Sequence, residues 1–212
     1  AAGAASVHET LALLTEASQM GFEIALIQTP GGFGPELLDA ETQMLFVRSV
    51  ADGSPIPLIV SPEWSSGEPL QPEVLAVLGR NPRVAALLVV TDDLGYFSSC
   101  LAAAQGHADV IVGCASLLAE GLIDGASAAM ISFASVVPYL CLSIDEAVRT
   151  RELDAARDLQ RVAKGAIEQI RKRGIPGLKA AADLKGYYGG VPRLPLVPLP
   201  PAAKAEIEAA LQ

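Results

Sequence analysis

The chain has 212 residues, enough for one large domain with a sizeable core. Half of the residues are hydrophobic and only 18% are charged, which excludes a disordered chain. The net charge of −9 argues against nucleic acid or an anionic membrane as the partner. No apolar run reaches the ~18 residues that a membrane span needs, so no span is expected.

The residues that usually hold metals or cofactors are sparse. The two histidines, His8 and His107, have no cysteine, histidine or carboxylate at metal-ligand spacing, so no metal site is expected. The run GGFG at residues 31–34 is too short for a dinucleotide fingerprint and is interpreted as a loop, so no cofactor is expected. Three widely spaced cysteines, an odd number, favour a reducing compartment over a disulfide framework.

Apolar periodicity predicts strands that alternate with helices along the first two thirds of the chain. The expected strands are at residues 22–30, 56–62, 83–91, 108–113 and 127–132. The expected helices are at residues 7–20, 35–51, 73–78, 94–104 and 115–121. The strands are apolar on both faces, which is typical of a parallel sheet covered by helices or closed into a barrel.

After Ser132 the pattern becomes helical. Helices are predicted over residues 136–150, 153–173 and 175–185, and a last amphipathic helix ends the chain. The Pro-rich segment VPRLPLVPLPP, residues 191–201, is expected to be extended. We expect Tyr187 or Tyr188, Leu194 and Leu196 to be buried against the preceding helices, as parts of a packing element.

Two adjacent aspartates, Asp92 and Asp93, follow the third expected strand. Such a position suits a general base, because ligands of α/β proteins bind beyond the carboxyl ends of strands. It also suits the N-cap and first turn of the helix that begins at Leu94, and we favour this capping role.

The C-terminal region resembles that of a known superfamily. The runs ELDAARDLQ, from residue 152, and RKRGIPGLKAAADLKGYYGGVPRLPLVPL, from residue 171, are similar to the end of the dihydrodipicolinate synthase and N-acetylneuraminate lyase superfamily. Within it, the closest likeness is to mitochondrial 4-hydroxy-2-oxoglutarate aldolase, through GIPGLK, GYYGG and R.PL. Upstream, GFEIALIQTP, SPIPLIV, NPRVAALLV and DGASAAMISFASVVP follow the order of the family.

The resemblance implies a (β/α)8 TIM barrel followed by a helical extension. Here the barrel is expected to be incomplete, with about five βα units in residues 1–135, and the extension to comprise residues 136–212, the two forming a single structural unit. Ala1–Thr10 matches the region after the family's third strand. The family's chemistry is that of class I aldolases, in which a lysine forms a Schiff base with a 2-oxo acid.

Matched position by position, the residues for this chemistry are absent. The Schiff-base lysine position is Leu88, and the sequence contains no lysine before Lys164. The family's proton-relaying tyrosine corresponds to Val60 or Ser61. A second tyrosine pair is replaced by residues 31–33, and the loop that binds the substrate carboxylate would precede Ala1.

These departures predict a catalytically degenerate member of the family, used as a structural or assembly subunit with protein partners or further copies of itself. One alternative is an active 2-oxo acid lyase whose lysine lies outside the expected position. Another is a sensor that binds a small molecule without chemistry. Its pocket candidates are the polar residues at strand ends, Thr29, Ser61, Thr91 and Ser132. The resemblance implies the mitochondrial matrix as the location, with the cytoplasm as the alternative.

Overall fold

The structure, a computed structural model, describes residues 1–30, 39–61 and 71–212. The GGFG run and the start of the helix expected from residue 35 lie outside these ranges. The chain divides into two compact units. The first comprises Ala1–Gly113 and Asp124–Ala129, and the second comprises Cys114–Ile123 and Met130–Gln212.

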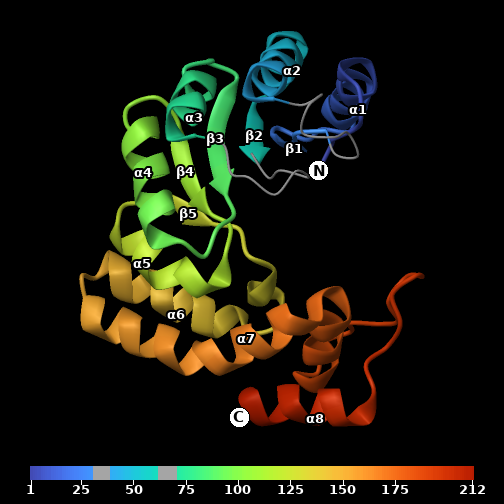
Figure 1. Cartoon of the computed structure of the whole chain (residues 1–212), viewed down its shortest axis with the longest axis vertical. Coiled ribbons are helices and arrows are strands. Elements are labelled where there is room, and N and C mark those ends of the chain that lie inside the picture. The colour runs from blue at the N-terminus through green and yellow to red at the C-terminus, as the bar shows by residue number, and fades with distance from the viewer. Residues whose placement is uncertain (31–38, 62–70) are drawn as a thin grey trace. The chain divides into compact units, whose positions relative to one another are not determined.

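The first unit is built on a parallel sheet whose strands follow the chain order (Figure 1). In the described ranges these strands are β1 (Ala25–Gln28), β2 (Leu58–Ser61), β3 (Val84–Val89), β4 (Asp109–Val112) and β5 (Ala128–Ala129). All five expected strands are therefore present. The last is shorter than the expected 127–132, and within the described residues it pairs on one side only, with β4.

The helices of this unit show that the sheet is wound in one direction. Consecutive helices contact one another, so they lie on the same face of the sheet (Figure 1). They are α1 (Val7–Gln19), α2 (Ala40–Gly53), α3 (Pro72–Gly79) and α4 (Leu94–Ala104). A doubly wound sheet would reverse its strand order and place helices on both faces. Sequential order with helices on one face is the arrangement of a (β/α)8 barrel, here partial, as expected.

Three helices of the first unit begin with side-chain caps. The Asp93 carboxylate accepts a hydrogen bond of 3.1 Å from the Tyr96 N–H at the start of α4, which confirms the capping role. Ser6 caps α1 through the Glu9 N–H. Asp39 caps α2 through the Thr42 N–H at 2.8 Å, and this hydrogen bond holds the pKa of the Asp39 carboxyl below its ordinary value.

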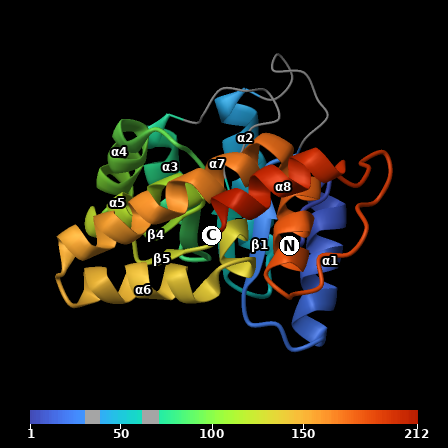
Figure 2. The ribbon, with the colours of Figure 1, turned by 90° about the horizontal axis from the view of Figure 1, so that it is seen from below.

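The second unit is helical. Its elements are η1 (Ala115–Leu117), α5 (Leu118–Ile123), η2 (Ser132–Ser135), α6 (Pro138–Arg149), α7 (Leu153–Leu184) and α8 (Pro201–Ala210). Both α6 and α8 pack against α7 (Figure 2). Their shared core contains buried apolar side chains such as Phe133, Val136, Ile167, Ile170 and Ile207. In the part of the chain that the structure describes, no helix is long and apolar enough to cross a membrane.

The break predicted between residues 173 and 175 appears as a kink in α7. Gly174 has φ 56° and ψ −140°, outside the helical region, and Pro176 follows it. A positive φ of this kind is readily adopted by glycine alone. The GIPGLK run therefore redirects α7 between two helical segments.

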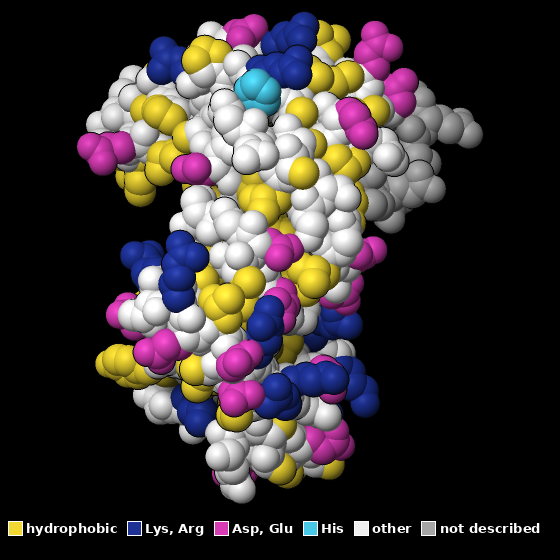
Figure 3. Space-filling view, turned by 90° about the vertical axis from the view of Figure 1, so that its left-hand side faces the viewer, with side chains coloured by type: hydrophobic (Ala, Val, Ile, Leu, Met, Phe, Trp, Pro, Cys, Tyr) yellow, Lys and Arg dark blue, Asp and Glu magenta, His cyan; other side chains and the backbone are white. Residues whose placement is uncertain are grey.

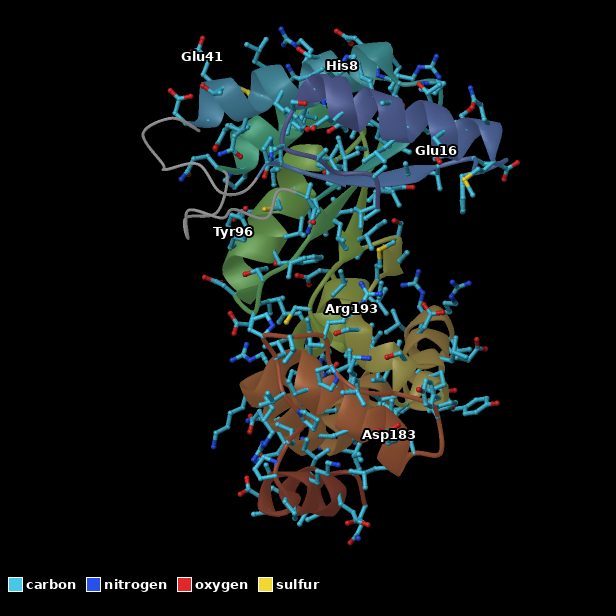
Figure 4. The ribbon with its side chains drawn as sticks, turned by 90° about the vertical axis from the view of Figure 1, so that its right-hand side faces the viewer. His8, Glu16, Glu41, Tyr96, Asp183 and Arg193 are labelled. Atoms are coloured by element: carbon cyan, nitrogen blue, oxygen red, sulfur yellow. The ribbon has the colours of Figure 1, made fainter. Side chains whose placement is uncertain are left out.

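The GYYGG run is fastened to the second half of α7. The Lys179 ammonium donates a hydrogen bond of 2.6 Å to the carbonyl of Gly189. The Asp183 carboxylate, labelled in Figure 4, accepts one of 2.8 Å from the Gly189 N–H. Because Lys179 and Asp183 are one helical turn apart, they hold both backbone groups of one glycine. This clamp gives a structural reason for the spacing of GLK and GYYGG.

The expected burial of the next segment is wrong. Tyr188 and Leu194 are 94% and 85% exposed, and Tyr187 and Leu196 are also largely exposed, at 46% and 40%. The segment leaves α7, turns where the Leu196 N–H bonds to the Arg193 carbonyl, and returns to α8 (Figure 1). Its prolines cannot donate backbone hydrogen bonds, so it forms an extended surface loop and not a packing element.

Candidate functional site

The sheet of the first unit has one face whose side chains form a separate apolar cluster. Strand residues alternate between faces, and the cluster takes alternate residues from neighbouring strands: Leu26, Ile59, Ala86, Leu88 and Ile111. The intervening residues, such as Val60, Leu87 and Val112, are fully or almost fully buried and point to the other face. Leu88, only 6% exposed, is therefore part of a hydrophobic core.

The register of the strands places Ser61 beside Leu88. Val60 pairs with Leu87, so the next residue of each strand, Ser61 and Leu88, lie side by side on the face of the cluster. Gln28 pairs with Ser61 on one side, and Ile111 pairs with Leu88 on the other. Of the two residues matched to the family's tyrosine, only Ser61 shares a face with Leu88, because Val60 points the opposite way.

Ser61 is the unusual member of this row. Its side chain is completely buried, and its hydroxyl oxygen has no hydrogen-bond partner among the described residues. A buried polar group without a partner costs about 1–3 kcal/mol. The hydroxyl lies at the carboxyl end of β2, the edge of a parallel sheet where ligands usually bind.

The other pocket candidates are not equivalent to Ser61. Thr29, 8% exposed, directly follows β1. The Thr91 hydroxyl accepts a hydrogen bond of 3.1 Å from the Asp93 N–H and so belongs to the turn before α4. Ser132 is exposed at the start of η2 and belongs to the second unit. Ser61 therefore ends one strand of the sheet, and Thr29 and Thr91 follow the ends of its two neighbouring strands.

No activated thiol or phenol is found near this sheet in the described residues. Cys100 and Tyr96 lie one turn apart on α4, and burial raises the pKa of both side chains. In the second unit, burial likewise raises the pKa of Cys141. A nucleophilic cysteine needs the opposite shift, because the thiolate is the reactive form.

Neither histidine belongs to a cluster of possible metal ligands in the described residues. His8 lies exposed on α1 (Figure 4), and His107 is exposed before β4. Across the described ranges, no three side chains of His, Cys, Asp or Glu lie close enough together to hold a metal ion.

The lysines all belong to the second unit. On the face of this unit that Figure 3 shows, basic and acidic side chains are interspersed. Lys179 bonds to Gly189, and the Lys185 ammonium donates a hydrogen bond of 2.9 Å to the Leu211 carbonyl. The Lys164 Nζ lies 4.0 Å from the Glu168 Oε1, and both side chains are exposed on α7.

Solved structures share this fold over nearly the whole chain. Dihydrodipicolinate synthase from Thermotoga maritima superposes with a TM-score of 0.90 at 19% identity, covering 99% of this chain and 72% of that one. A putative dihydrodipicolinate synthetase from Pseudomonas aeruginosa gives a TM-score of 0.89 at 21% identity, with the same coverage.

Curated relatives include both synthases and aldolases. A 4-hydroxy-tetrahydrodipicolinate synthase of Exiguobacterium is 28% identical, over 92% of this chain and 67% of the relative. A probable mitochondrial 4-hydroxy-2-oxoglutarate aldolase of Emericella nidulans is 26% identical, over 99% and 67%. An L-threo-3-deoxy-hexylosonate aldolase of Aspergillus niger is 30% identical, over 92% and 65%. The chain thus spans about two thirds of the length of these relatives. The sequence model of the dihydrodipicolinate synthetase family matches residues 1–212, and the chain belongs to this family.

Proposed function

We propose that the chain is a catalytically degenerate member of its family, kept as a structural or assembly subunit. The observation that carries the proposal is the position of Leu88. A Schiff base requires an amine whose lone pair can attack the keto carbon, and the side chain at the matching position is an alkyl group in an apolar cluster. Neighbouring Ser61 supplies a hydroxyl but no amine.

Borohydride trapping tests the absence of Schiff-base chemistry. Incubation with pyruvate or 4-hydroxy-2-oxoglutarate and then borohydride should add no mass to any peptide from residues 1–163, because these residues include no lysine. An active Schiff-base aldolase, treated in parallel, controls for the reagents. The measurement is peptide mass mapping of the whole chain.

The site of any adduct separates the alternatives. A reduced adduct at one lysine, formed with the 2-oxo acid and abolished when that lysine is replaced by arginine, would support the active lyase and overturn the degenerate reading. Low labelling spread over exposed lysines, equal with an unrelated aldehyde, is surface chemistry and leaves the proposal standing.

The buried hydroxyl of Ser61 favours one second candidate, a sensor that binds a small molecule without reacting with it. A ligand that meets this hydroxyl stabilises the folded state and raises the melting temperature. A concentration-dependent rise with a 2-oxo acid, lost in Ser61→Ala, supports the sensor. If no 2-oxo acid raises the melting temperature, the sensor is rejected and the structural role stands.

An assembly role predicts self-association or a requirement for partners. The loop after α7 exposes Tyr188, Val191 and Leu194, each more than 70% accessible, and exposed apolar patches often mark protein interfaces. Sedimentation of residues 1–212 should give a mass above that of one chain, or a monomer that binds a dye for apolar surface. A cooperatively folded monomer that binds no dye would contradict the assembly role.

A further inference from the structure

The sequence contains the dipeptide Asp–Gly at two places, Asp52–Gly53 and Asp124–Gly125. In such a pair the glycine amide nitrogen can attack the aspartate side chain, because glycine has no Cβ to hinder the approach. The nitrogen bonds to the side-chain carboxyl carbon, water leaves, and a succinimide ring forms. Water then opens either ring carbonyl, which returns aspartate or gives isoaspartate, whose backbone runs through the side-chain carbons. The net reaction is an isomerisation that needs no co-reactant.

The two pairs are alike in solvent access and in side-chain bonding. Both residues of each pair are exposed. The Asp52 carboxylate accepts a hydrogen bond of 2.9 Å from the Asn81 amide, and the Asp124 carboxylate accepts one of 2.6 Å from the Ser98 hydroxyl. Neither exposure nor the anchoring of the carboxylate therefore favours one pair over the other.

The backbone separates the two pairs. Asp52 and Gly53 end α2, where N–H groups bond along the helix and each nitrogen is held away from the preceding side chain. A Cβ on Gly53 would lie 3.0 Å from the Leu11 Cδ1, so this end of α2 is also packed against α1. Asp124 and Gly125 lie in a turn between α5 and β5, and Gly125 has a φ of 115°. The helical restraint on the nitrogen is therefore absent in the second pair.

We propose that Asp124–Gly125 is a site of spontaneous isoaspartate formation in the folded protein, and that Asp52–Gly53 is protected from this reaction. The chain passes from the second unit to the first between Ile123 and Asp124. Isoaspartate at position 124 therefore lengthens one of the backbone connections between the units by a methylene carbon. The product presents a free α-carboxylate, the group that isoaspartyl methyltransferases methylate. The inference is independent of the proposed function.

The test is incubation of the intact chain for weeks at neutral pH, followed by mass spectrometry with fragmentation that locates the modified residue. A protein-isoaspartate methyltransferase serves as the probe, because it adds a methyl group to the isomerised residue. Isoaspartate at residue 124 should exceed that at residue 52 about tenfold, since Asp52 must first lose a helical hydrogen bond, whose net contribution is a factor of about ten in equilibrium. Equal amounts at the two positions, or none at residue 124, would overturn the proposal.

A sample unfolded in urea supplies the matched comparison. Unfolding removes α2, so the two pairs should form isoaspartate at similar rates in urea. A preference for residue 124 that persists in urea would come from the neighbouring sequence and would refute the structural cause.

A substitution locates the reacting side chain. Asp124→Glu keeps the carboxylate but would have to close a larger ring, so methylation at this position should be lost. An unchanged melting temperature confirms that the variant is folded. Methylation of the folded Asp124→Glu protein to the same extent as the wild type would place the reaction at another residue and refute the assignment.

Discussion

Replacement of Gly189 by alanine should destabilise the second unit by about 3 kcal/mol or more, combining overpacking with weakened charged hydrogen bonds. A Cβ at this position would lie 2.0 Å from the carbonyl oxygen of Lys179 and 2.7 Å from its carbonyl carbon. Both are backbone atoms of α7, which cannot move aside as a flexible side chain can. The GYYGG segment would have to leave the helix, and the bonds from Lys179 and to Asp183 would lengthen or break.

Chemical denaturation followed by circular dichroism measures this effect, and α7 supplies a matched control. Gly165 has nothing within 4 Å of the position of an added Cβ. Gly165→Ala should therefore stabilise the helix by about 0.5–1 kcal/mol, because glycine is disfavoured in helix interiors. A Gly189→Ala protein with an unchanged denaturation midpoint would show that the clamp contributes nothing to stability.

The sequence predicted the elements well because local signals agreed with one another. Alternating apolar strands and helices gave the five strands of the first unit, Asp93 capped α4 as expected, and Gly174 with Pro176 marked the kink of α7. Each of these signals acts within a few residues, so it does not depend on how distant segments of the chain pair with one another.

Features that depend on pairing between distant segments could not be predicted in the same way. A shift of one residue in strand register moves every side chain to the opposite face. The sequence alone therefore left Val60 and Ser61 equivalent, and the pairing of Val60 with Leu87 separates them.

The loop after α7 was mispredicted for a different reason. Leu194 and Leu196 alternate with prolines, and apolar side chains in a folded chain are usually buried. Their backbone, however, makes a turn that carries both residues away from α7. Apolar character alone does not say whether a side chain is covered by its own chain or by another protein. The exposed side chains of this loop are a surface through which the proposed assembly could form.

Leu88→Lys should produce a less stable protein without aldolase activity. The new ammonium would replace an alkyl group that is 6% exposed and surrounded by Ile59, Ala86 and Ile111. Ser61 offers it one hydroxyl and no counter-charge. Burial without a partner costs several kcal/mol for a charged group, so we expect a loss of about 3–5 kcal/mol relative to the wild type. Leu88→Met, which conserves volume, should lose less than about 1.5 kcal/mol.

The pH dependence of this loss identifies its cause. Desolvation lowers the pKa of a buried lysine in the folded state below the ~10.4 of the unfolded chain. The folded state then binds fewer protons, so the stability of Leu88→Lys should rise with pH between the lowered value and ~10.4, whereas that of Leu88→Met should not. A penalty that stays constant over this range would indicate a steric cause. Turnover of 4-hydroxy-2-oxoglutarate by Leu88→Lys alone would show that Ser61 and its surroundings retain the remaining catalytic groups, and that a single substitution inactivated the family site.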